Sequence, residues 1–177
     1  MQPAQLKELE REVRTFAVTN YILNKLRKHG INDITNLKLQ KVLYIAYGLH
    51  LCLFETRLFE SQIQAWRLGP VIYDVYREFR DHGNNIITTT AKAIDPKTGE
   101  FFTPQIDAEI NPKAIDIACT TYGQERAWNL VDITHDTNSA WKKNYREGQN
   151  GIHIQDDDIR NEFEARIGEI ANYFSKK

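Results

Sequence analysis

The segment from residue 36 to residue 54 constrains the fold most, because it is apolar on almost every side when drawn as a helix. A helix that is apolar all round must be buried by neighbouring elements or by lipid. A glycine and a histidine interrupt the apolar run from Val42 to Phe54, and that run is too short to cross a bilayer. We therefore expect a helix at the centre of the hydrophobic core of a soluble protein, with Thr35 or Asn36 as the N-cap of that helix.

Amphipathic patterns on both sides of this segment supply helices that can cover it. Apolar residues three and four positions apart predict helices over residues 6–28, 111–122, 127–133 and 156–174. Gly69-Pro70 predicts the start of one more helix, ending at Gly83, because proline loses no hydrogen bond in a first helical turn. We find no linker that would separate two domains, so the sequence predicts one mainly α domain over residues 1–177.

One clear β pattern follows the third predicted helix. Residues 86–94 are rich in isoleucine and threonine, residues 95–99 carry turn-forming chemistry, and residues 100–106 can return as a second strand. A two-stranded hairpin is only marginally stable alone in water, so it should pack on helices or on a partner. The predicted fold class is therefore a single compact helical domain with a small antiparallel β-hairpin inserted after the third helix.

Charge and cysteine usage exclude several classes of protein. The net charge of −1 gives no general attraction to nucleic acid or to anionic membranes. Cys52 and Cys119 are the only cysteines and form no CxxC pair, which favours two buried thiols in a reducing cytosol. The charged beginning of the chain lacks the apolar core of a signal peptide, so we expect a cytoplasmic protein.

Only one pattern points to an enzyme. The chain has no glycine-rich phosphate loop, no HExxH and no GxSxG. His135-Asp136 could hold a divalent metal together with an upstream histidine, His50 or His82, and an aspartate from 156–158. The alternative, which we favour, is that His135 hydrogen-bonds a helix end and closes a loop.

The three tryptophans can be interpreted either as core residues or as residues that bind a partner. Tryptophan is common at binding hot spots, yet apolar neighbours favour core packing for Trp66 and Trp128. Trp141 is followed by lysines and by Tyr145 and Arg146, a cluster that can grip nucleic acid. An acidic run follows closely, so a solvated helix face is the better interpretation of this cluster.

Three segments follow one another along the chain: residues 37–44, residues 65–71, and residues 130–135 with a tryptophan six positions later. In this order and spacing they resemble the Panacea domain family, also described as SocA-like antitoxins or GepA-like phage proteins. The likeness covers about residues 12–174 and leaves 1–11 as an N-terminal helix extension. The chain has Ala140 where the family usually has proline. The motif positions are Leu39, Gln40, Lys41, Tyr44, Trp66, Gly69, Pro70, Thr134, His135 and Trp141.

This resemblance implies an antitoxin that neutralises a cognate protein toxin by direct binding. The family's antitoxins are often encoded beside their toxins on prophages or other mobile genetic elements. The resemblance implies no enzymatic activity, no cofactor and no metal, and we expect neither membrane binding nor direct nucleic-acid binding. Two alternatives stay open: an adaptor that delivers a toxin or other partner to a protease, and a metal-dependent phosphohydrolase built on His135-Asp136.

The motif residues and the toxin contacts are expected to be different sets. We interpret the motif residues as mainly structural, because a domain that meets varied toxins should keep its scaffold and vary its outer surface. We predict toxin contacts on the hairpin and on adjoining acidic helix faces, with addition of a partner strand as one route. The predicted contact residues are Thr88, Thr90, Lys92, Lys97, Phe101 and Thr103.

Overall fold

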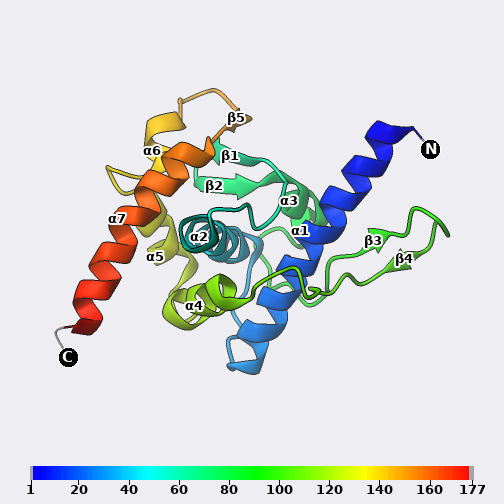
Figure 1. Cartoon of the computed structure of the whole chain (residues 1–177), viewed down its shortest axis with the longest axis horizontal. Helices are drawn as coiled ribbons and strands as arrows, with labels where there is room; N and C mark the ends of the chain where they lie inside the picture. The colour runs from blue at the N-terminus through cyan, green and yellow to red at the C-terminus, as the bar shows by residue number, and fades with distance from the viewer. Residues whose placement is uncertain (1, 176–177) are drawn as a thin grey trace.

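Helix α2 (Asn36–Phe54) runs through the middle of the molecule, as its sequence predicts. The computed structural model describes residues 2–175, without the side chains of residues 3 and 169–175. Figure 1 looks nearly along α2 and shows other elements on all sides of it. Every residue from Lys38 to Leu51 is buried. The hydroxyl of Thr35 accepts a hydrogen bond from the Lys38 amide and caps the helix, which confirms the predicted start.

Six further α-helices and one short 3₁₀ turn make up the helical part of the described chain. The predicted helices at both ends and between residues 111 and 133 are confirmed, whereas a short helix at residues 140–144 was not predicted. No helix among the described residues is long and apolar enough to cross a membrane. The elements are α1 (Pro3–Lys28), α3 (Tyr73–Phe79), η1 (Arg80–His82), α4 (Lys113–Tyr122), α5 (Ala127–Thr134), α6 (Ala140–Asn144) and α7 (Asp156–Ser175).

A small antiparallel sheet, which the sequence did not predict, covers one side of α2 (Figure 1). It contains β1 (Ile63–Trp66), β2 (Gly69–Ile72) and β5 (Ile152–His153) in the order β2-β1-β5. The prediction that Gly69-Pro70 begins a helix was therefore wrong, and the helix begins at Tyr73.

The position of Pro70 in the sheet explains this error. Trp66 pairs with Gly69 next to a two-residue turn, and Ala65 pairs with Pro70. In such a hairpin the pair beside the turn exchanges hydrogen bonds and the next pair does not. The nitrogen of Pro70 therefore points away from β1, on an edge strand, where the missing N–H costs no ladder hydrogen bond.

The predicted hairpin exists but is shorter than expected. Strands β3 (Ala93–Ile94) and β4 (Phe101–Phe102) pair over two residues each, and the tip is closed by the turn between Asp95 and Glu100. The arms do not continue because their backbone groups bond elsewhere. The Ile87 amide donates to the carbonyl of Ile34, and the Lys92 amide donates to the carboxylate of Glu78.

Asn20 on α1 holds both arms of the hairpin at their base. Its side-chain amide donates to the carbonyls of Ala91 (3.1 Å) and Pro104 (3.0 Å), and its oxygen accepts from the Ala91 amide (2.8 Å). Asn20 is fully buried, so these bonds form away from water. The hairpin therefore extends from a fixed base, beside α1 (Figure 1).

Helices α2 and α7 cross in close contact where α2 carries Gly48. A Cβ atom at this position would lie 2.2 Å from the ring of Phe163. One residue before Phe163, the buried carboxylate of Glu162 accepts from the Tyr44 hydroxyl (2.6 Å) and from the Ala140 amide (2.8 Å). The missing side chain of Gly48 thus sets the spacing of the two helices, and Glu162 joins them to α6.

We predict that Gly48→Ala lowers the free energy of unfolding by about 3 kcal/mol, the upper part of the range for overpacked cores. The added methyl group cannot fit without moving Phe163 or α7. Urea unfolding followed by circular dichroism measures the change.

Gly168→Ala is the matched control, since that position in α7 has no atom within 4 Å of an added Cβ. Alanine there should stabilise the protein by up to about 1 kcal/mol through its higher helix propensity. Equal stabilities for the two variants would contradict the close packing of α2 on α7.

Candidate functional site

The three motif segments of the sequence meet around the side chain of Lys41. Lys41 lies on α2, Gly69 and Pro70 lie on β2, and Thr134 ends α5. A Cβ atom at Gly69 would lie 3.0 Å from both the Lys41 ammonium and the Thr134 hydroxyl. With its φ of +103°, this position suits glycine for conformational reasons as well. Residues far apart in the sequence therefore form one packed cluster.

Lys41 is fully buried and has no carboxylate partner among the described residues. Its ammonium donates to the carbonyl of Pro70 (3.0 Å). Burial disfavours the charged form and lowers the pKa of Lys41 to about 7. Lys38, one turn earlier and equally buried, has the carboxylate of Asp33 2.6 Å away. Lys41 thus differs from its neighbour in lacking a counter-ion.

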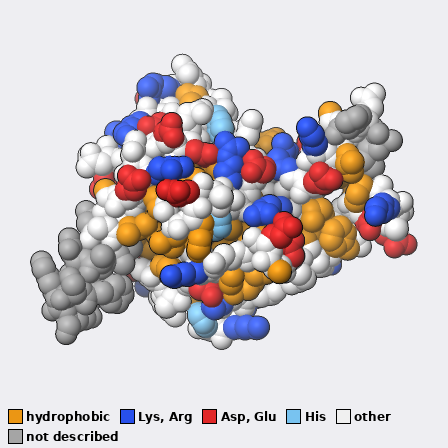
Figure 2. All heavy atoms as spheres, in the orientation of Figure 1, with side chains coloured by type: hydrophobic (Ala, Val, Ile, Leu, Met, Phe, Trp, Pro, Cys, Tyr) orange, Lys and Arg blue, Asp and Glu red, His pale blue; other side chains and the backbone are white. Residues whose placement is uncertain are grey.

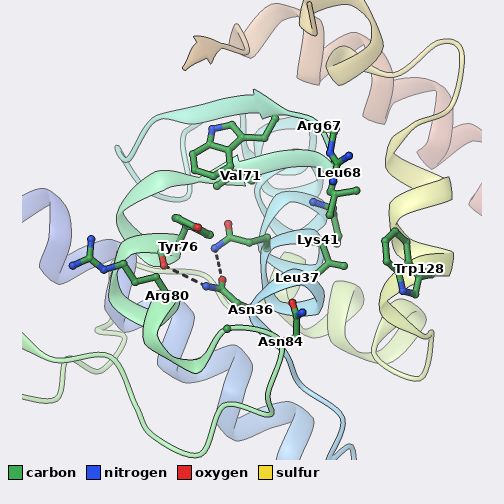
Figure 3. A pocket seen from close by; sticks show the side chains of 13 residues that line it. Asn36, Leu37, Lys41, Arg67, Leu68, Val71, Tyr76, Arg80, Asn84 and Trp128 are labelled. Atoms are coloured by element: carbon green, nitrogen blue, oxygen red, sulfur yellow. Dashed lines mark hydrogen bonds between the residues drawn. The ribbon is translucent and has the colours of Figure 1, made fainter. Parts of the chain in front are cut away.

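Gln40 completes the contact between α2 and the edge of the sheet. Its side-chain oxygen accepts from the Ile72 amide (2.8 Å), and its nitrogen donates to Asn36 (3.0 Å). Asn36 in turn donates to the carbonyl of Tyr76 (3.2 Å), as the dashed lines in Figure 3 show. Lys41 and Gln40 therefore bond the outer edge of β2, which no further strand covers.

A stack of three rings connects α5 to α6. The His135 ring lies parallel to Trp141 at 3.6 Å between centroids, and Tyr145 stacks on the same indole at 4.8 Å. The Trp141 indole N–H donates to the carbonyl of Trp66 (2.7 Å), which joins the stack to β1. Burial, and then the nearby positive charge of Lys41, lower the pKa of His135.

His135 hydrogen-bonds the end of α5, as the sequence suggested, but through its backbone amide and not through its ring. Its backbone amide caps α5 by donating to the carbonyls of Val131 and Asp132, while the ring stacks. Its Nε2 is buried without a hydrogen-bond partner among the described residues. The loop is thus closed by stacking and by the backbone.

The ligand set for the alternative metal site does not form. No group of three or more histidine, cysteine, aspartate and glutamate side chains gathers at a possible metal position in the part of the chain that is described. His50 bonds the carbonyl of Thr56 through Nδ1, and Asp156 pairs with Tyr47 and Arg57. His135 and Asp136 therefore do not join the other predicted ligands.

A pocket of about 550 Å³ opens beside Lys41. Its walls come from α2, the turn between β1 and β2, the end of α3 with η1, and α5 (Figure 3). The lining contains three cationic side chains and no acidic one. Its residues are Asn36, Leu37, Gln40, Lys41, Trp66, Arg67, Leu68, Val71, Tyr76, Arg80, Gly83, Asn84 and Trp128. We call this the Lys41 pocket.

Trp128 stands at one side of the Lys41 pocket and is 62% exposed, so the prediction that it fills the core was wrong. Leu130, Val131 and Thr134 form the buried face of α5. Trp128 lies two positions before Leu130 and so points away from it on the helix, at the margin of this buried face.

The hairpin presents a second surface, with apolar rings in solvent. Phe101 is 73% exposed and Phe102 is 38% exposed. Figure 2 shows hydrophobic side chains on this side of the molecule, near the charged groups of the hairpin tip. Of the six predicted contact residues, Thr88, Lys92, Lys97 and Phe101 are exposed, and Thr90 and Thr103 are half-buried. Lys92 and Thr103 are hydrogen-bonded to each other.

A cleft of about 380 Å³ separates α1 from the hairpin and the segment that follows it. Glu10, Asp107 and Glu109 contribute carboxylates to its lining, and Arg14 is its only basic residue. The Nε of Arg14 donates to the carbonyl of Leu58. The hairpin therefore adjoins an acidic surface, which we call the α1 cleft.

A family model described as "Antitoxin SocA-like, Panacea domain" matches residues 39–142, more than half of the chain. The chain therefore belongs to the SocA-like Panacea domain family, which confirms the resemblance drawn from its motifs. The protein named "Antitoxin SocA" from Caulobacter vibrioides (strain NA1000 / CB15N) is 34% identical over 127 residues. This match covers 71% of the chain and 66% of the relative, just under two thirds of its length. No solved structure matches the chain.

We predict that Lys41 makes a contribution to the stability of the wild-type protein that rises between pH 7 and pH 9, below the range in which the raised pKa of Cys119 adds an opposing slope. The folded state releases this proton near pH 7, whereas the unfolded chain keeps it up to a pKa of 10.5, so the unfolded state binds more protons in this window. The slope contributed is at most about 1.4 kcal/mol per pH unit. Urea unfolding at several pH values measures it.

Lys41→Met should remove this slope while keeping an apolar side chain of similar length. Lys97→Met, at the exposed hairpin tip, keeps Lys41 and should keep the slope. The prediction fails if Lys41→Met and wild type show the same pH dependence.

Proposed function

We propose that this protein is an antitoxin that neutralises a cognate protein toxin by direct binding, with the hairpin as its main contact. Membership of the SocA-like Panacea domain family and the 34% identity to a protein named Antitoxin SocA support the antitoxin role. The observation that supports the contact is the exposed pair Phe101 and Phe102 on a hairpin with a fixed base. The proposal assigns no reaction and no cofactor to the chain.

The hairpin suits protein binding for two physical reasons. Exposed aromatic rings contribute large contact areas at low entropic cost and are enriched at binding hot spots. The β3-β4 sheet has only two strands, so each strand has one side without a neighbouring strand, to which an extended partner segment can add. Asn20 fixes the base of both arms, so little ordering is needed on binding.

The α1 cleft suggests the charge of the toxin surface that meets the hairpin. Glu10, Asp107 and Glu109 give it a negative character beside the exposed rings. Complementary charge speeds encounter and excludes unsuitable partners. We therefore propose a toxin surface with an apolar centre for Phe101 and basic residues at its margin.

Co-expression with the products of neighbouring genes tests the proposed function. We expect one of them to stop growth when expressed alone, and this chain to restore growth and to co-purify with it as a stable complex. A partner that disappears by degradation, rather than accumulating in a complex, would contradict neutralisation by stable binding.

The double variant Phe101→Ser, Phe102→Ser should weaken binding to that partner about tenfold or more, as expected for hot-spot aromatics. Leu53→Ser is the control, because Leu53 is 40% exposed at the far end of α2 and is not part of the hairpin. Calorimetric titration of purified proteins gives both affinities. Unchanged affinity in the double variant would exclude the hairpin as the main contact.

A further inference from the structure

The Lys41 pocket is a separate feature that the proposed hairpin contact does not use. Its positive groups are Lys41 at the base, Arg67 on the β1-β2 turn and Arg80 on η1. Figure 3 shows Arg67 and Arg80 on opposite sides of the pocket, with Tyr76 near Arg80 and Leu37 on the side of Arg67. The positive charge is therefore spread along the pocket and not concentrated at one point.

None of these three charges is neutralised by a close carboxylate in the described structure. Lys41 bonds only the carbonyl of Pro70, and Arg67 forms no ion pair. Arg80 approaches only its neighbour Asp81, at 3.7 Å, with both side chains largely in solvent. An exposed ion pair of this kind contributes little free energy, so it leaves the charge of Arg80 available to a ligand. The pocket therefore keeps a positive potential, which comes mainly from Arg67 and Arg80.

The remaining walls combine aliphatic and aromatic side chains with the amides of Asn36, Gln40 and Asn84. Leu37, Leu68 and Val71 contribute aliphatic surface, and Trp128 exposes its indole at one side. The volume of about 550 Å³ falls within the range of about 300–1,000 Å³ for binding pockets. An exposed tryptophan beside arginines is the composition of a binding hot spot.

We propose that the Lys41 pocket binds an acidic peptide segment of a protein partner, with carboxylates at Arg67 and Arg80 and a bulky apolar side chain against Trp128. Charge complementarity supports this occupant, since every charged group in the lining is positive. The separation of the two arginines fits carboxylates spaced along a chain better than one compact polyphosphate (Figure 3). The site is distinct from the hairpin and does not depend on the proposed function.

Titration of the full-length, ¹⁵N-labelled protein with the peptide Ac-Phe-Glu-Leu-Glu-NH₂ tests the proposal. We expect shifts of the Trp128 indole signal and of amides around the β1-β2 turn, saturating below about 5 mM. The matched peptide Ac-Phe-Gln-Leu-Gln-NH₂ should bind about tenfold more weakly, because it lacks the charges.

Variants assign the binding to this pocket. Arg67→Gln with Arg80→Gln should weaken binding of the acidic peptide about tenfold, and Trp128→Ala by a similar factor. Arg126→Gln is the control, because Arg126 is exposed near Trp128 but does not line the pocket. All four side chains are exposed. Arg67 lies on the turn between β1 and β2, and the other three lie on or beside helices, so we expect the variants to fold.

Three results would overturn the proposal. The first is the absence of any signal shift at the pocket up to about 5 mM peptide, because such an affinity would be weaker than that of a specific short peptide. The second is equal binding of the acidic and the amide peptide. The third is guanosine diphosphate binding at the same residues more tightly than the acidic peptide, which would assign the pocket to a phosphate-bearing ligand.

Discussion

The whole arrangement depends on burying α2 on every side. Such a helix leaves no exposed face for its polar side chains, so each of them needs a partner in the surrounding layer. Gln40 and Lys41 find theirs on the outer edge of β2, at the Ile72 amide and the Pro70 carbonyl. Tyr44 finds its partner in Glu162 of α7. These few bonds position the sheet and α7 around the central helix.

The motif residues and the proposed contact residues lie in different parts of the structure. The motif residues are mostly buried and several of them hydrogen-bond other elements of the core, so we expect a change in these residues to act on the fold first. The proposed contact residue Phe101 is exposed and bonds nothing in the core, so it can vary at little cost to stability. This division fits a domain proposed to meet a protein partner through its outer surface.

Sequence patterns predicted the helices well, because apolar spacing reports directly on which face is buried. They failed where partners distant in sequence decide the outcome. Gly69-Pro70 forms an edge strand because α2 bonds that edge, and nothing local to the dipeptide indicates this. Trp128 is exposed although its neighbours are apolar, and helical spacing from Leu130 could have revealed it. Asn20 and Glu162 carry no sequence signal that marks them as anchors.

Hydrogen-exchange mass spectrometry of the chain, free and bound to the proposed toxin, distinguishes a hairpin contact from a contact elsewhere. We expect slow exchange in α2 in both states, because that helix opens only with the whole core. We also expect new protection on binding across residues 92–103 and the facing part of α1. Unchanged exchange of the hairpin, with protection confined to surfaces away from it, would exclude the hairpin as the main contact.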